Sequence, residues 1–128
     1  MLIKDIIAMQ PTLANIVTQK LPFSLAYKFS KLAKVVDDNF AFYREQVQAL
    51  INECALKDDK GEIVHDEENS DIIKLKSDMA ADFERRAKEL QEVEITDEVP
   101  TFKFTDFEDK IELTTQEVIA LMPVIREE

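Results

Sequence analysis

The feature that most constrains this chain is an apolar repeat with the period of a helix. Between residues 22 and 56, apolar side chains recur at steps of three or four: Leu25, Phe29, Leu32, Val36, Phe40, Tyr43, Val47, Leu50 and Cys54. Such steps keep side chains on one face of a helix. Pro22 suits the first turn, where its missing N–H leaves no bond unmade. We therefore predict one helix over about residues 22–56, roughly 50 Å long at 1.5 Å per residue.

A second, shorter apolar stripe follows an acidic segment. Its members are again spaced by three or four residues: Ile72, Leu75, Met79, Phe83, Ala87 and Leu90. Asn69 or Ser70 can cap this helix, which we place over residues 70–91. The two striped helices, joined by an acidic connector (residues 57–69), predict a long antiparallel helical hairpin. Because the first helix is longer, part of it must be covered by another segment or by another chain.

Shorter elements are expected before and after the hairpin. Pro11 is expected to begin a short N-terminal helix that ends near Gln19, and residues 1–7 fit a strand or a helix equally well. Residues 92–113 contain the alternating stretches VEIT and TFKF, which predict short strands.

The sequence TTQE predicts the start of a last helix over residues 115–126. Thr114 and Glu117 have the spacing of a capping box, in which each side chain bonds to the other's backbone. The side chains expected to face inward are Val118, Ile119, Leu121 and Met122.

The scarcity of glycine supports a helical class. Gly61 is the only glycine among 128 residues, whereas all-β domains and phosphate-binding loops need several. Apolar residues make up 45% of the chain, enough for a modest core. We predict a single domain, residues 1–128, of mainly α class: a long antiparallel helical hairpin with a short N-terminal helix, a small C-terminal β element and a short C-terminal helix.

Charge is distributed unevenly along the chain. The net charge is −11, but residues 1–56 sum to +1 and residues 57–128 to −12. An acidic half repels phosphates, so direct nucleic-acid binding is not expected. The acidity serves either solubility alone or a basic partner.

The cysteine content and the hydropathy of the chain predict its cellular compartment. The only cysteine, Cys54, cannot form an internal disulfide, which favours a reducing compartment. The sequence shows neither a leader peptide nor an apolar run of roughly 20 residues. We expect a cytoplasmic protein without membrane attachment.

The acidic connector resembles a calcium loop in composition but fails in register. With Gly61 at the sixth position of an EF-hand loop, Leu56 takes the first and Lys60 the fifth, and neither binds a cation. A turn with Gly61 at positive φ is the better reading.

No other group of residues predicts chemistry. His65 lies beside carboxylates, but a catalytic zinc needs three protein ligands held rigidly. Cys54 lies on the apolar stripe, with no histidine close in sequence to act as its base. We therefore predict no catalytic residue, metal or cofactor.

The aromatic residues of the long helix are the best candidates for binding. One seam cannot bury all of them, so some must pack elsewhere or contact a partner. The candidates are Phe23, Tyr27, Phe42 and Tyr43. Lys28, Lys31 and Lys34 form a neighbouring row, which is either a solvated flank or a basic contact for an acidic partner, such as the acidic half of a second copy.

Four motifs together resemble a known family. They are KLP (20–22), AYK (26–28), KDDKGE (57–62) and ELTTQEVIALMPVI (112–125). In this order they resemble a family of small uncharacterised helical proteins of tailed bacteriophages and prophages. The resemblance implies a phage origin and no catalytic constellation, and it transfers no functional residue.

Two functions compete. The first is a non-catalytic protein–protein interaction module in phage assembly or structure, or an adaptor. It would form a homodimer or larger oligomer, or bind another host or phage protein, in the host cytoplasm or the virion. The second is an acidic inhibitor of a host enzyme, such as a defence nuclease, that mimics nucleic-acid charge through Glu92, Glu94, Asp97 and Glu98.

Overall fold

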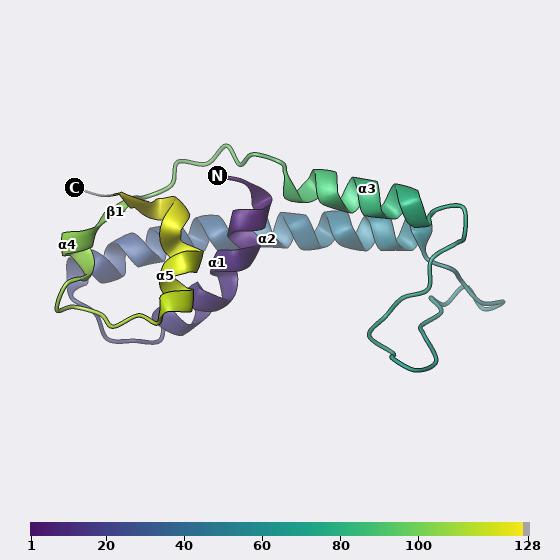
Figure 1. Ribbon diagram of the computed structural model, residues 1–128, viewed down its shortest axis with the longest axis horizontal. Coiled ribbons are helices and arrows are strands. Elements are labelled where there is room, and N and C mark those ends of the chain that lie inside the picture. Colours follow the sequence, from purple (N-terminus) through teal and green to yellow (C-terminus); the bar gives the residue numbers. More distant parts are fainter. Residues whose placement is uncertain (127–128) are drawn as a thin grey trace. The chain divides into compact units, whose positions relative to one another are not determined.

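The computed structural model describes residues 1–126 and is mainly helical, with one small two-stranded sheet (Figure 1). The elements are α1 (Ile3–Ile16), α2 (Phe23–Cys54), α3 (Ala80–Gln91), β1 (Phe102–Lys103), α4 (Phe104–Phe107), α5 (Thr115–Leu121), the 3₁₀ helix η1 (Met122–Val124) and β2 (Ile125–Arg126). The chain divides into two compact units. The first unit holds residues 1–41 and the described residues from Val93 onward, and the second holds Phe42–Glu92, so α2 contributes to both.

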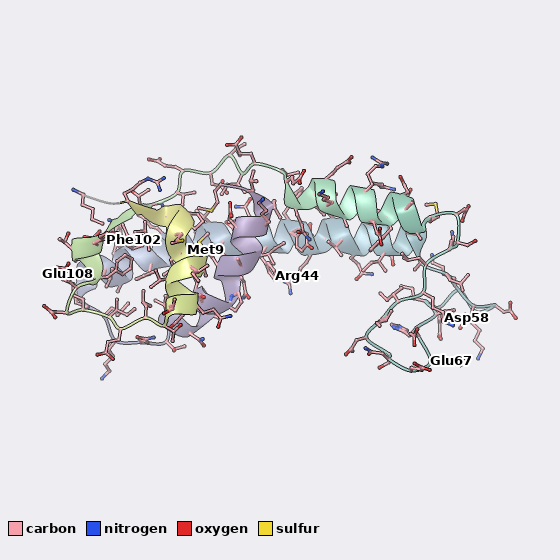
Figure 2. The ribbon with its side chains drawn as sticks, viewed as in Figure 1. Met9, Arg44, Asp58, Glu67, Phe102 and Glu108 are labelled. Carbon is pink, nitrogen blue, oxygen red and sulfur yellow. The ribbon has the colours of Figure 1, made fainter. Side chains whose placement is uncertain are left out.

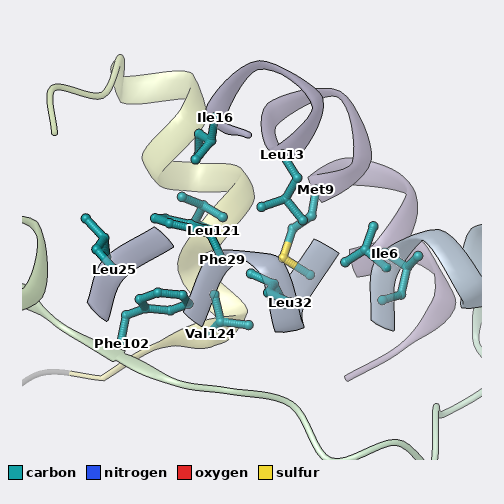
Figure 3. Close-up of a cluster of buried hydrophobic side chains, with 11 residues drawn as sticks. Ile6, Met9, Leu13, Ile16, Leu25, Phe29, Leu32, Phe102, Leu121 and Val124 are labelled. Atoms are coloured by element: carbon teal, nitrogen blue, oxygen red, sulfur yellow. The ribbon is translucent and has the colours of Figure 1, made fainter. Parts of the chain in front are cut away.

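The core of the first unit gathers one apolar face from each of several elements (Figure 3). The α1 face contributes residues spaced by three and four, and so does the first half of α2. The buried members are Ile6, Met9, Leu13, Ile16, Leu25, Phe29, Leu32, Val36, Phe102, Leu121 and Val124. All are at most 3% exposed, so this cluster is the main hydrophobic stabilisation of the first unit.

The first helix begins earlier than the sequence predicted. It starts at Ile3, and Pro11 lies inside it rather than at its start. The Asp5 carboxylate accepts a bond from the backbone N–H of Leu2 at 2.9 Å, which caps the helix start. Pro11 is exposed, and the buried face on the other side of α1 continues from Met9 to Leu13, which holds the helix together across the missing hydrogen bond.

Of the strands predicted in residues 92–113, the one in TFKF is confirmed in part as β1, and the one in VEIT is absent. β1 ends at Lys103, because residues Phe104–Phe107 form α4, whose first turn is capped by Asp106. β1 pairs in parallel with β2, placing Phe102 opposite Ile125. The predicted helix over 115–126 therefore ends early: Pro123 lies in η1, and the chain leaves it in an extended conformation.

The stretch VEIT runs beside the N-terminus without forming a strand. The backbone N–H of Ile3 donates to the carbonyl of Val93 at 2.9 Å, and that of Ile95 donates to the carbonyl of Met1 at 3.0 Å. Glu94 forms an isolated antiparallel bridge with Leu2. These bonds satisfy the backbone of residues 93–95 locally.

In the second unit, the predicted helix over 70–91 starts only at Ala80. Ahead of it, isolated bridges pair Leu75 with Ala55, and Ile73 with His65. The backbone of residues 72–76 thus bonds to neighbouring segments, an arrangement that suits the β-branched Ile72 and Ile73. The second helix has 12 residues, and the antiparallel hairpin of the predicted length is not confirmed.

Two side-chain contacts join α3 to the second half of α2. Arg86 pairs with Glu53 at 2.8 Å, and the side-chain amide of Gln91 donates to the hydroxyl of Tyr43 at 3.5 Å. No helix within residues 1–126 has the length and apolar character that a bilayer span requires.

The acidic connector is an ordered loop. The Asp58 carboxylate accepts the backbone N–H groups of Lys60 at 2.9 Å and Glu62 at 3.0 Å. Gly61 has a φ of 79°, which confirms the predicted turn. Figure 2 shows the side chains of this loop, with Asp58 and Glu67 labelled.

Candidate interaction surface

The predicted aromatic residues fall into two places. Phe23 and Tyr27 belong to the first unit, whereas Phe42 and Tyr43 belong to the second. Phe23 is 84% exposed, Tyr27 52% and Phe42 45%. Tyr43 is partly buried and accepts the bond from Gln91, so it is the least available of the four.

The structure brings Phe23 and Tyr27 together. Their ring centroids are 6.1 Å apart and the ring planes differ by 16°, a stacked pair on the outer surface of α2. The buried residues of α2 begin at Leu25 and Phe29, two positions after each of these aromatics. Two positions turn a helix by about 200°, so the stacked pair lies on the face opposite the core.

Two lysines extend this face. Lys31 places its Nζ 4.8 Å from the centre of the Tyr27 ring, a cation–π contact. Lys34 pairs with Asp38 at 3.1 Å. Both side chains are largely exposed, so the pair contributes little to stability. We call Phe23, Tyr27, Lys31 and Lys34 the aromatic–lysine row.

A groove borders the row. Lys31, Lys34 and Val35 of α2 form one side, and Glu98, Val99 and Pro100 form the other, enclosing about 360 Å³. Its apolar parts come from Val35, Val99 and Pro100, and its charged parts from the two lysines and Glu98. The groove was missed by sequence reasoning because residues 98–100 meet α2 only through the fold.

Lys28 has a different role from its neighbours in the predicted basic row. Its Nζ donates to the carbonyl of Thr101 at 2.6 Å and pairs with Asp106 at 3.2 Å. It also lies 5.0 Å from the centre of the buried Phe102 ring. The backbone N–H of Lys103 is the main cause that lowers the pKa of Asp106, and Lys28 adds to it. Lys28 therefore holds α4 and β1 to α2.

The four predicted acidic residues have different surroundings. All are exposed. Asp97 accepts a bond from the Asn39 side chain at 2.6 Å, Glu94 lies in the bridge to Leu2, and Glu98 lines the groove. Glu92 belongs to the second unit, at the end of α3.

Cys54 and His65, the residues considered for catalysis or metal binding, differ in their exposure. Cys54 is fully buried and His65 is exposed. Within residues 1–126, no three His, Cys, Asp or Glu side chains come together in a way that could hold a metal ion.

No protein-family model, curated protein or solved structure matches this chain.

Proposed function

We propose that this chain is a non-catalytic protein–protein interaction module that binds its partner through the aromatic–lysine row. One observation carries the proposal: Phe23, 84% exposed, stacks on the half-exposed Tyr27 on the face of α2 opposite the core. An exposed phenylalanine contributes little to folding. Buried in an interface, the same ring anchors binding, because aromatic side chains bring large apolar area with few rotatable bonds.

The surrounding features suit such an interface. Aromatic anchors in known interfaces are ringed by polar groups that exclude water. Here Lys31 and Lys34 supply those groups, and the groove beside them offers apolar walls to a side chain of the partner. Phe42, an exposed residue of α2 in the second unit, would be a second, separate contact.

The biological setting we propose is the assembly or structure of a tailed bacteriophage, or an adaptor role in the infected cell. The support is the resemblance of four motifs to a family of small phage proteins. A partner would then be another copy of this chain, or another protein of the phage or its host.

The test compares capture of partners by the wild-type chain and by Phe23→Ala/Tyr27→Ala. Both residues are exposed, so the variant should keep the wild-type circular dichroism spectrum and melting temperature. We expect loss of at least tenfold in affinity for the captured partner, the scale at which interface anchors act. Val17→Ala, a change at another exposed apolar residue of the first unit, is the matched control. Equal binding by all three proteins would refute the proposal.

A second candidate function is inhibition of a host nucleic-acid-binding enzyme by charge mimicry. It is favoured by the exposure of Glu92, Glu94, Asp97 and Glu98. Changing all four to Gln or Asn together should abolish inhibition. Inhibition should also weaken steeply with salt, as contacts between exposed charges do. Inhibition that survives all four changes would exclude this function.

A further inference from the structure

The aromatic–lysine row lies in the one strongly basic part of an acidic sequence. Residues 6–36 contain four lysines and no aspartate or glutamate, in a chain whose net charge is −11. Among the described residues, Lys31 forms no ion pair, and its ammonium group lies over the Tyr27 ring. Lys34 has only the weak surface pair with Asp38. A partner for this surface must therefore offer carboxylates together with apolar groups.

The acidic connector of the same chain has that chemistry. Residues 57–69 contain six carboxylates and two lysines, a net charge of −4 that is opposite in sign to the two lysines of the row. Exposed apolar side chains flank the connector in sequence: Leu56 is 41% exposed and Ile72 52% exposed. These groups could contact the rings of Phe23 and Tyr27 while carboxylates contact the lysines.

The connector is also preorganised for binding. Asp58 holds the turn at Gly61, and the Asp66 carboxylate accepts the backbone N–H of Glu68 at 2.8 Å. Isolated bridges pair Lys57 with Ile63, and His65 with Ile73. A loop already held in shape loses less conformational entropy on binding than a flexible one. The side chains of Glu67 and Glu68 remain exposed on it.

We propose that the acidic connector of a second copy of this chain binds the aromatic–lysine row, so that two copies form a reciprocal dimer. This inference rests on the proposed function and names the partner. In a two-fold dimer each copy supplies one row and one connector, so both contacts form twice and the assembly closes. The basic row and the acidic connector are complementary in charge and belong to the same chain. A second copy therefore supplies the surface that each of them needs.

The first measurement is molar mass by light scattering and sedimentation over a range of concentrations. We expect about twice the 14.8 kDa of one chain near 0.1 M salt, and dissociation toward the monomer near 1 M salt. The screening length falls from about 10 Å to about 3 Å over that range. A chain that stays monomeric at every concentration in 0.1 M salt would overturn the inference. A connector that bound the row of its own chain would give this monomeric result.

Charge reversal with mixing is the decisive test. Lys31→Glu/Lys34→Glu and Glu67→Lys/Glu68→Lys should each weaken self-association by about tenfold or more, because like charges then face each other. Mixed in equal amounts, the two variants should recover at least part of the lost association, since reversed row and reversed connector again attract. Failure of the mixture to associate more tightly than either variant alone would overturn the inference.

Matched controls separate a specific contact from a change in net charge. Lys4→Glu/Lys88→Glu changes the charge as much as the row variant does, at exposed lysines outside the row, and should dimerise like the wild type. Loss of dimerisation in this control would count against a specific contact. All variants should keep the wild-type melting transition.

Other occupants give distinct results. Binding of a single-stranded oligonucleotide to a monomeric chain, lost in Phe23→Ala/Tyr27→Ala, would overturn the inference in favour of a nucleic-acid ligand stacked on the rings. A monomeric chain that captures a different protein through the row would overturn the dimer while the proposed function stands. A dimer that persists in Phe23→Ala/Tyr27→Ala would overturn both the dimer contact and the proposed function at the aromatic–lysine row.

Discussion

The ring of Phe29 stacks on the ring of Phe102, with centroids 4.7 Å apart and planes inclined by 29°. The contact joins α2 to β1 within the first unit, and both rings are almost completely buried. Phe107 of α4 lies 5.4 Å from Phe102 and completes the cluster. These rings fix the last third of the chain to α2, so the core should depend strongly on Phe102.

Phe102→Ala should lower the free energy of unfolding by about 3–5 kcal/mol, the usual cost of removing a buried ring. Denaturant unfolding followed by circular dichroism measures it. Phe23→Ala is the matched control, because that ring is exposed, and it should change stability by no more than about 0.5 kcal/mol. Similar losses in the two variants would contradict the burial described for Phe102.

Asp106 should make the stability of the first unit depend on acid pH. The bond from the backbone N–H of Lys103 and the charge of Lys28 lower the pKa of Asp106 below the 3.8 of an unperturbed aspartate. A depressed pKa stabilises the fold at pH values above the unfolded pKa, and this contribution is lost as pH falls through the folded value. The stability difference between the wild type and Asp106→Asn should therefore be constant from pH 7 to about pH 5 and shrink below about pH 4.

Unfolding free energies at pH 7, 5, 4 and 3 provide the measurement. Glu108→Gln removes one exposed carboxylate just after α4 and serves as the control for a lost charge. A gap between wild type and Asp106→Asn that stays the same down to pH 3 would show that the carboxylate contributes nothing through its charge.

The cap of α5 gives a third prediction. The Thr114 hydroxyl accepts the backbone N–H of Glu117 at 3.1 Å, and the Glu117 carboxylate accepts that of Thr114 at 3.0 Å, which confirms the predicted capping box. Thr114→Ala should cost about 1 kcal/mol. Thr115→Ala changes the neighbouring threonine, outside the cap, and should be near neutral. Thermal unfolding distinguishes them, and equal shifts in melting temperature would argue against the cap.

The parts of the fold that local pattern specifies could be predicted from sequence. α2 lies within the range expected from its stripe, because its repeat persists over many turns and outweighs any local exception. The turn at Gly61 and the cap at Thr114 depend on a few adjacent residues. Counting aromatics against one seam predicted that some would lie off it, and the exposed Phe23 and Tyr27 are two of these.

The remainder depends on contacts between distant segments. The pairing of β1 with β2, and of residues 72–76 with neighbouring segments, satisfies backbone groups that a local pattern would assign to strands or helices elsewhere. The groove beside the row forms because residues 98–100 lie next to α2, and no local sequence pattern predicts that contact. Short elements such as α4 and α5 also carry too few turns for their apolar residues to define a face.

The α5 helix shows this limit most directly and supplies the last prediction. Four residues were expected to face inward, yet only Leu121 is buried, whereas Val118, Ile119 and Met122 are exposed. Leu121 belongs to the core of the first unit and Ile119 is 60% exposed. The sequence prediction was wrong for three of the four residues, because Leu121 is the one residue of α5 that is fully buried.

Leu121→Ala should therefore lower the free energy of unfolding by about 2–5 kcal/mol, the range for a truncated core side chain. Ile119→Ala should stay within about 0.5 kcal/mol of the wild type, since the site is exposed and alanine favours helix. The two variants remove similar apolar volume from the same helix, so each is the control for the other in one denaturation series. A larger loss at position 119 than at position 121 would mean that α5 presents the opposite face to α1, and that the core of the first unit is closed by different residues.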